Sequence, residues 1–232
     1  TIAKRIKLFN LYRVLNIRSI SDLSFFYHEY SRHVVFYLFT IKFIILCYII
    51  LQRLKRVNKI LTGLSAKSND NSNEIDVKSK IEKLRTCYKL HTDLCKSARI
   101  LNHIYNLPLL TRYFQAMIIP LLNSYHMIKQ HRTSLDYMLT IVCYNGNFML
   151  PAFVIAGLCH MTSQEAAKAA TLIYRVADKD NRNIKEIVQT WCLQMHHRKT
   201  KFMVAGFFDL DIIYISKVCI TIISGLILAL QF

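Results

Sequence analysis

The sequence contains few residues that break helices and no closely paired cysteines. Only five of its 232 residues are glycine and three are proline, which argues against a β-sandwich, a barrel or a disordered linker protein. Seven cysteines are scattered without a CxxC pair, so neither a disulfide framework nor a zinc ribbon is indicated. This composition favours long helices with reduced, packed thiols.

Motifs of common enzyme classes are also missing. No HExxH, GxSxG or P-loop pattern occurs, so the chain is not expected to be an enzyme. Cys192 and His196 have the i, i+4 spacing of a metal-binding pair, with His197 adjacent, but no further ligands lie nearby in the sequence. We therefore expect no metal and no cofactor.

What the chain does contain is apolar sequence combined with positive charge. It is 53% hydrophobic and carries a formal net charge of +17. Four stretches approach the roughly 20 apolar residues that cross a bilayer. These observations predict an all-α, polytopic transmembrane helical bundle. The candidate spans are 34–51, 104–128, 136–159 and 205–232, and the last of them is a helix in two parts.

The distribution of the basic residues predicts which side of the membrane each segment faces. Residues 52–103 hold 12 Lys/Arg against 5 Asp/Glu, and residues 161–202 hold 8 against 4. By the positive-inside rule both segments are cytoplasmic, which places the C-terminus, residues 129–135 and residues 1–33 outside. Because the bases flank the spans instead of forming one patch, a nucleic-acid partner is not expected.

The two cytoplasmic segments also show helical periodicity. In the segment 52–103, apolar residues fall on one face and charged residues on the opposite face. The segment 160–204 has a similar pattern. We expect helices that run from the cytosol into the membrane and pack through these apolar faces, which consist of Ile81, Leu84, Tyr88, Leu94, Ala98 and Leu101 in one segment and Ala167, Ala170, Ile173, Tyr174, Ile184, Ile187, Val188 and Trp191 in the other.

Charges within the apolar stretches need an explanation. A lysine at the middle of a span costs roughly 2.5–3.5 kcal/mol, so Lys42 should face a bundle interior or a watery cavity. For Arg112 we expect snorkelling toward an interface. In the last segment, 205–217 carries charges and 218–232 carries none, so the proximal half should pack among the cytoplasmic helices and the distal half should cross the outer membrane half.

The chain ends in SGLILALQF, residues 224–232. A terminal helix with Ser224, Gly225 and Gln231 beside Leu228 can line a water-filled path if several chains each supply one, because leucine rings gate pores by dewetting and polar rings replace part of an ion's hydration. From this pattern alone a lipid-facing last helix is the more common case.

This ending resembles that of the insect gustatory receptors, members of the seven-transmembrane insect chemoreceptor superfamily, whose last helix closes with Thr-Tyr, five mostly apolar residues and Gln-Phe. Gln231 and Phe232 match, whereas Ser224 and Gly225 replace Thr-Tyr. The stretches 205–211 and 80–110 also resemble the family. The resemblance covers almost the whole chain as about four of seven expected spans.

The resemblance implies a taste receptor subunit in the plasma membrane: a ligand-gated, non-selective cation channel that assembles as a homo- or hetero-tetramer and is opened by a small-molecule tastant. It implies long cytoplasmic anchor helices, an extracellular C-terminus and a pore lined by the last helix. The implied pore and gate residues are Ser224, Leu228, Gln231 and Phe232. The candidate ligand contacts, in the outer half of the bundle, are Tyr37, Lys42, Gln115, Asn123, Tyr137 and Tyr144.

Two alternatives remain open at this point. A secondary transporter also uses broken helices and charges within the membrane, but it predicts substrate accumulation and inverted repeats, and no repeat is visible in the sequence. A truncated receptor fragment that does not signal is the other alternative.

Overall fold

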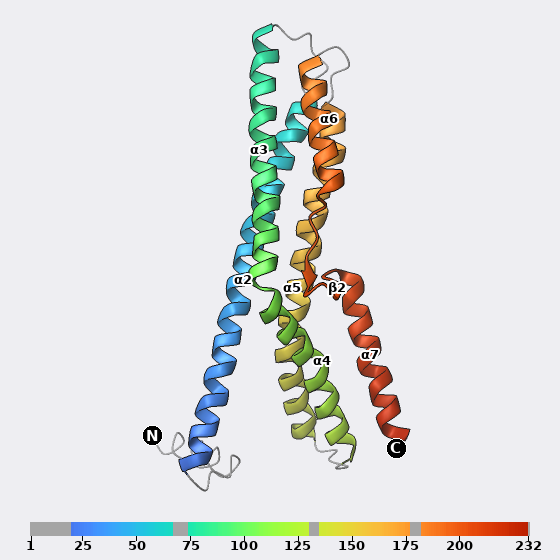
Figure 1. Ribbon diagram of the computed structural model, residues 1–232. Helices are drawn as coiled ribbons and strands as arrows, with labels where there is room; N and C mark the ends of the chain where they lie inside the picture. Colours follow the sequence, from blue (N-terminus) through green and yellow to red (C-terminus); the bar gives the residue numbers. More distant parts are fainter. Residues whose placement is uncertain (1–19, 67–73, 130–134, 177–181, 232) are drawn as a thin grey trace. The chain divides into compact units, whose positions relative to one another are not determined.

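The computed structural model describes residues 20–66, 74–129, 135–176 and 182–231. These residues form α2 (Ile20–Ala66), α3 (Glu74–Ile104), α4 (Asn106–Lys129), α5 (Leu135–Val176), α6 (Arg182–His197), the strands β1 (Met203–Val204) and β2 (Phe208–Asp209), and α7 (Ile212–Gln231) (Figure 1). Two compact units divide at residue 41, within α2. The prediction of an all-α fold is confirmed, with one two-stranded hairpin added to it.

The helices α2 and α5 continue well past the predicted ends of their apolar stretches. The helix α2 has 47 residues and α5 has 42, although the apolar stretches were expected to end at 51 and 159. After residue 51 the sequence becomes polar without any residue that stops a helix, and Leu54, Val57 and Leu61 continue a buried stripe. The change in hydropathy therefore marks a change of surroundings and not the end of a helix.

Length and composition identify two stretches of the described helices that are able to cross a membrane, Val34–Ser65 and Leu139–Val176, and a shorter apolar stretch, Ser216–Gly225. At 1.5 Å per residue, α5 is about 63 Å long, roughly twice the thickness of the hydrocarbon core. Part of α5 must therefore lie outside a membrane that it crosses. The four predicted spans remain a prediction.

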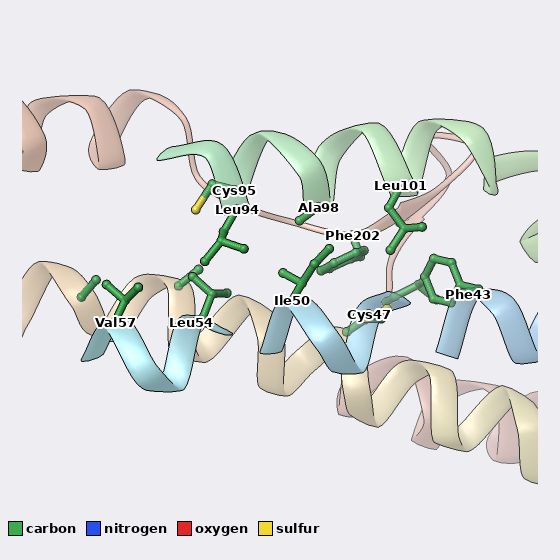
Figure 2. Close-up of a cluster of buried hydrophobic side chains, with 14 of the residues drawn as sticks. Phe43, Cys47, Ile50, Leu54, Val57, Leu94, Cys95, Ala98, Leu101 and Phe202 are labelled. Carbon is green, nitrogen blue, oxygen red and sulfur yellow. The ribbon is translucent and has the colours of Figure 1, made fainter. Parts of the chain in front are cut away.

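The predicted apolar face of α3 is confirmed. Leu84, Leu94, Ala98 and Leu101 are buried, Ile81 and Tyr88 pack partly buried against the core, and the charged residues of the opposite face are exposed. This face meets the second half of α2: Phe43, Cys47, Ile50, Leu54 and Val57 lie opposite Leu94, Ala98 and Leu101 in Figure 2. Burial of such large side chains contributes about 1.5–3 kcal/mol each.

The second predicted apolar face is correct for α6 and partly wrong for α5. Ile184, Val188 and Trp191 are buried on α6. On α5, however, Ala167 is exposed and Tyr174 is 77% exposed, whereas Ala166, Ala169 and Ile173 are buried. Successive helical residues differ by about 100° in direction. The buried residues of this stretch centre on the direction of Ala169, and Tyr174 and Ala167 lie roughly 140–160° away from it, on the opposite side of the helix.

A hydrogen-bonded pair of aromatic rings joins α3 to α6. Trp191 donates its indole N–H to Nδ1 of His91 over 3.3 Å, and Nε2 of His91 lies 3.2 Å from the carbonyl oxygen of Ala166 on α5. With Nδ1 accepting, the proton of the neutral ring belongs on Nε2, where it is donated to Ala166. Protonation would set a second N–H against the indole N–H. Burial accordingly lowers the pKa of His91, although the bond to Ala166 partly opposes this.

Acidification is expected to loosen the contact between α3 and α6. Because the folded-state pKa of His91 lies below its ordinary value, its contribution to stability is present above that value and is lost as pH falls through the folded pKa. Trp191 is the single tryptophan of the chain, so its fluorescence reports this site directly. Emission should shift to longer wavelength as pH is lowered from neutral toward 5. The variant His91→Gln should lack this pH dependence; an unchanged titration in it would contradict the assignment.

The proximal half of the predicted last helix is instead a hairpin. Met203 pairs with Asp209 and Val204 with Phe208, and the turn passes through Ala205 and Gly206, which both have positive φ. Positive φ suits glycine and stops helix propagation, so the expectation of helix from residue 205 was wrong. The helix α7 begins only at Ile212.

Two asparagines at the junction of α3 and α4 hold this hairpin. Asn102 accepts a hydrogen bond from the backbone N–H of Met203 at 3.3 Å, and Asn106 accepts one from that of Ala205. The junction itself has a local cause: Pro108 lacks the N–H that would bond the carbonyl of Ile104. The break between α3 and α4 thus positions the residues that lead into α7.

Candidate functional site

The helices α4 and α5 meet through polar groups inside otherwise apolar sequence. Arg112 is only 2% exposed; it donates to the backbone oxygen of Asn147 over 3.0 Å, and its guanidinium carbon lies 5.4 Å from the centre of the Phe148 ring. The prediction that Arg112 snorkels to an interface is therefore wrong. Its charge is held by a carbonyl and an aromatic face on α5.

Four of the predicted ligand contacts lie on these two helices, and the side chains of three of them are described. Asn123 of α4 donates to Oδ1 of Asn145 of α5 over 2.7 Å. Tyr144, about half exposed, packs edge-on against Phe148 with ring centres 5.2 Å apart. Gln115 is partly buried, and its Oε1 is buried without a hydrogen-bond partner among the described residues. The contact between α4 and α5 thus offers polar and aromatic groups within apolar surroundings.

The two predicted contacts on α2 are not placed at this contact between α4 and α5. Tyr37 is partly buried and belongs to the unit of residues 1–41. Lys42 is exposed on α2, so the expectation of a bundle interior is not met within one chain. The side chain of Tyr137 lies outside the described part.

The last helix, α7, presents three distinct faces. Val218 is buried and Gly225 is partly buried on the face toward α4, where a Cβ on Gly225 would lie 3.1 Å from Cδ1 of Leu121. A second face is apolar and exposed: Ile220, Ile223 and Ile227. Between these two faces lies a third, which we call the polar stripe, made of Lys217, Thr221, Ser224 and Leu228, all exposed.

The polar stripe follows the period of the helix. Its members are spaced four, three and four residues apart, which keeps them within one narrow sector of an α-helix. Gln231, the last residue of α7, continues this spacing by position, while its side chain and all of Phe232 lie outside the described part. Gly225 faces α4, so the prediction that it lines the path beside Ser224 was wrong.

A family model described as "7tm Chemosensory receptor" matches residues 8–232. The chain belongs to this chemosensory receptor family. It is also similar to "Putative gustatory receptor 28b" of Drosophila melanogaster, with 22% identity over 189 residues, which cover 77% of this chain and 40% of that protein. The chain thus spans less than half the length of that relative. The predicted membership in the insect gustatory receptor family is confirmed.

Family membership establishes the broad nature of this receptor. It is a membrane protein of a family of chemosensory receptors. The apolar stretches of α2 and α5 agree with a membrane location. Within the described ranges, no three His, Cys, Asp or Glu side chains are grouped to hold a metal ion.

Several residues of the receptor's polar contacts were missed in the sequence. Asn145, Asn147 and Phe148 form the α5 side of the contact with α4, and the stretch YNGNF, residues 144–148, places two asparagines in an apolar run. Buried polar side chains are usually paired, so Asn145 was a usable signal for a partner on another helix, whereas Asn147 accepts from Arg112 through its backbone oxygen, which the residue type does not predict. The polar stripe could also have been found, because its spacing is visible once α7 is set to a helical period.

Proposed function

We propose that this receptor chain is a subunit of a ligand-gated, non-selective cation channel in the plasma membrane, opened by a tastant and assembled as a homo- or hetero-tetramer around α7. The polar stripe is the observation that carries the proposal. Lys217, Thr221 and Ser224 share one exposed sector. Thr221 already donates its hydroxyl to the backbone oxygen of Lys217 over 2.9 Å, whereas water along that sector would satisfy the Lys217 ammonium and the Ser224 hydroxyl, which lipid would not.

Each residue at the distal end of the stripe has a proposed role. Leu228 is 59% exposed in the single chain, and a ring of four such side chains gives an apolar constriction that closes by dewetting. Gln231 follows as a polar ring just outside it, with Phe232 at the end of the chain. Ser224 lies one turn before the constriction and offers a hydroxyl to hydrated cations.

The arrangement across the membrane follows from charge and length. Residues 52–103 and 160–204 contain the strongly basic parts of α3, α6 and the ends of α2 and α5, so they belong in the cytoplasm. The core between α2, α3 and α6 lies in these anchor helices. With the hairpin also on this side, α7 runs outward and the C-terminus is extracellular.

Water accessibility of α7 tests the pore directly. The variant Ser224→Cys should react rapidly with a charged thiosulfonate reagent applied to open channels, and its ligand-evoked current should change as it reacts, because charge is added beside the ion path. The matched control is Ile223→Cys, on the exposed apolar face. Its ligand-evoked current should change no more than that of the receptor without an added cysteine, whose exposed Cys143 gives the background reaction. Equal reaction rates at positions 223 and 224 would contradict the proposal.

A transport assay separates the channel from a transporter. The ligand that evokes current, found by screening sugars and bitter compounds on cells that express the receptor, should not accumulate inside those cells. Accumulation that saturates with concentration would favour the secondary transporter.

The tastant is proposed to bind in the outer half of the bundle. Asn123 and Tyr144 are candidate contacts on α4 and α5, and the exposed Lys42 is a separate candidate on α2. Replacing Lys42 with methionine keeps an unbranched side chain and removes the charge. Loss of one hydrogen bond from a charged group should raise the half-maximal ligand concentration about tenfold or more. Lys59→Met, on the same helix but in its predicted cytoplasmic half, is the control. An identical dose–response curve would remove Lys42 from the site.

A further inference from the structure

A cavity of about 430 Å³ lies among α3, α5, α6 and the segment 198–201 that follows α6. This volume falls in the range of roughly 300–1,000 Å³ that small-molecule sites occupy. The cavity is built by the anchor helices and is separate from the polar stripe of α7 and from the predicted tastant contacts. Its floor is formed in part by the rings of His91 and Trp191.

The charge around this cavity is of one sign. Arg99, Arg198, Lys199 and Lys201 line it, together with two histidines, and its lining contains no aspartate or glutamate. Lys201 is paired with Asp209 at 2.8 Å, so the uncompensated charge comes mainly from the other three side chains. Cations gathered at a concave surface attract an anion, and arginine with its planar fork of donors suits phosphate oxygens.

The cavity also offers groups that a bare anion does not use. Oε1 of Gln194 is buried and has no hydrogen-bond partner among the described residues; as an acceptor, it needs a donor such as a ligand hydroxyl. Thr92 of α3, Ser163 of α5 and Thr200 after α6 also line the cavity and carry hydroxyl groups. Ala167, Ala170 and Met195, which are not fully buried, supply apolar surface for a carbon skeleton.

We propose that this cavity binds a phosphorylated polyol, with the phosphate on the arginine and lysine side chains and a hydroxyl donating to Gln194. Two sources carry this chemistry: a soluble inositol phosphate and the headgroup of a phosphoinositide lipid. Either one would tie the segment 198–201 to α3 and α5, and this segment leads through the hairpin into α7. Binding does not depend on the channel activity proposed above and is measured without it.

Cys192 provides a reporter in the unmutated receptor. It lines the cavity and is partly buried, and burial raises the pKa of its thiol, so alkylation is followed at mildly alkaline pH. With the receptor in nanodiscs, inositol trisphosphate should slow alkylation of Cys192 several-fold and leave the exposed Cys143 unaffected, as read by mass spectrometry. Uncharged myo-inositol should not protect. The rate of Cys192 alkylation is compared in three conditions: without a probe, with inositol trisphosphate, and with phosphatidylinositol bisphosphate in the nanodisc. The same rate in all three would overturn the proposal.

The two probes distinguish the sources. Protection by soluble inositol trisphosphate in nanodiscs of phosphatidylcholine shows that a free solute suffices. Protection only when the nanodisc contains phosphatidylinositol bisphosphate assigns the site to a lipid headgroup. Both outcomes support the shared chemistry.

Charge-matched double variants test the assignment to this cavity. Arg198→Gln with Lys199→Gln should raise the dissociation constant of the protecting probe about tenfold or more. Arg182→Gln with Lys185→Gln removes the same charge from exposed positions of α6 outside the cavity and should have little effect. An equal loss in both pairs would indicate attraction to net charge alone and would overturn the site.

Gln194→Leu tests the contact with the polyol. It should weaken protection by inositol trisphosphate more than protection by pyrophosphate, which has no hydroxyl on carbon. Equal weakening of the two probes would remove Gln194 from the site. All exposed-residue variants should retain the thermal unfolding midpoint of the parent receptor, since they leave the core unchanged.

Discussion

Replacing Leu228 with alanine is expected to raise the cation current that flows without ligand. In the proposed tetramer the change replaces four isobutyl side chains of the narrowest apolar ring with methyl groups, so the closed pore becomes wider and easier to wet. A bias of about 1.4 kcal/mol toward the conducting state multiplies the open fraction about tenfold when that fraction is small. Basal current per receptor at the cell surface, measured by voltage clamp with surface labelling, checks this result.

The neighbouring residue Ile227 provides the control for this substitution. It has a similar exposure to Leu228 but lies on the apolar exposed face of α7, away from the polar stripe. Ile227→Ala removes the same kind of apolar side-chain volume and should leave basal current unchanged. Basal currents that rise equally in both variants would indicate a general loosening of α7 and would exclude a gate at Leu228.

Replacing Gly225 with tyrosine, the residue of the family pattern at this position, is expected to disrupt the receptor instead of restoring it. A Cβ at position 225 would already lie 3.1 Å from Cδ1 of Leu121, and the ring of tyrosine would have to displace α7 from α4. Overpacking costs about 1–3 kcal/mol for modest insertions. We expect lower surface expression and a lower unfolding midpoint, measured on the receptor in detergent.

Smaller changes make this test specific. Gly225→Ala should be close to neutral, since the gain in helix propensity of up to about 1 kcal/mol offsets a small shift of the flexible Leu121 side chain. Gly146→Ala, at an exposed site on α5 with open space around it, shows the helix effect alone. Leu121→Ala should partly rescue Gly225→Tyr by making room for the ring. Without any rescue, the clash with Leu121 would not be the cause.

The sequence predicted the helical class and the membrane character well because both depend on local properties. Apolar runs with few breakers define the helices α2 and α5, and the alternation of Leu84, Leu94 and Lys89 along α3 defines its buried and exposed faces. The family was accessible for a similar reason, since the ending from Ser224 to Phe232 is a short contiguous pattern.

The partners of buried polar groups could not be predicted in this way. Arg112 looked like a side chain that reaches an interface, and only its position against Asn147 and Phe148 shows that α5 holds it. The hairpin before α7 depends on Asn102 and Asn106, about 100 residues earlier. The basic cavity likewise forms only where α3, α5 and α6 come together, and the sequence of each helix alone does not predict it.

The sequence by itself determined that this receptor is helical, basic on the segments between its apolar stretches, and a member of its family, because hydropathy, charge and short motifs are properties of neighbouring residues. Only the tertiary structure decided where α7 begins, which of its faces carries the polar stripe, and why a glycine stands at position 225. Those features depend on contacts between distant residues, and the free energy of packing one helix against another cannot be read from either helix alone.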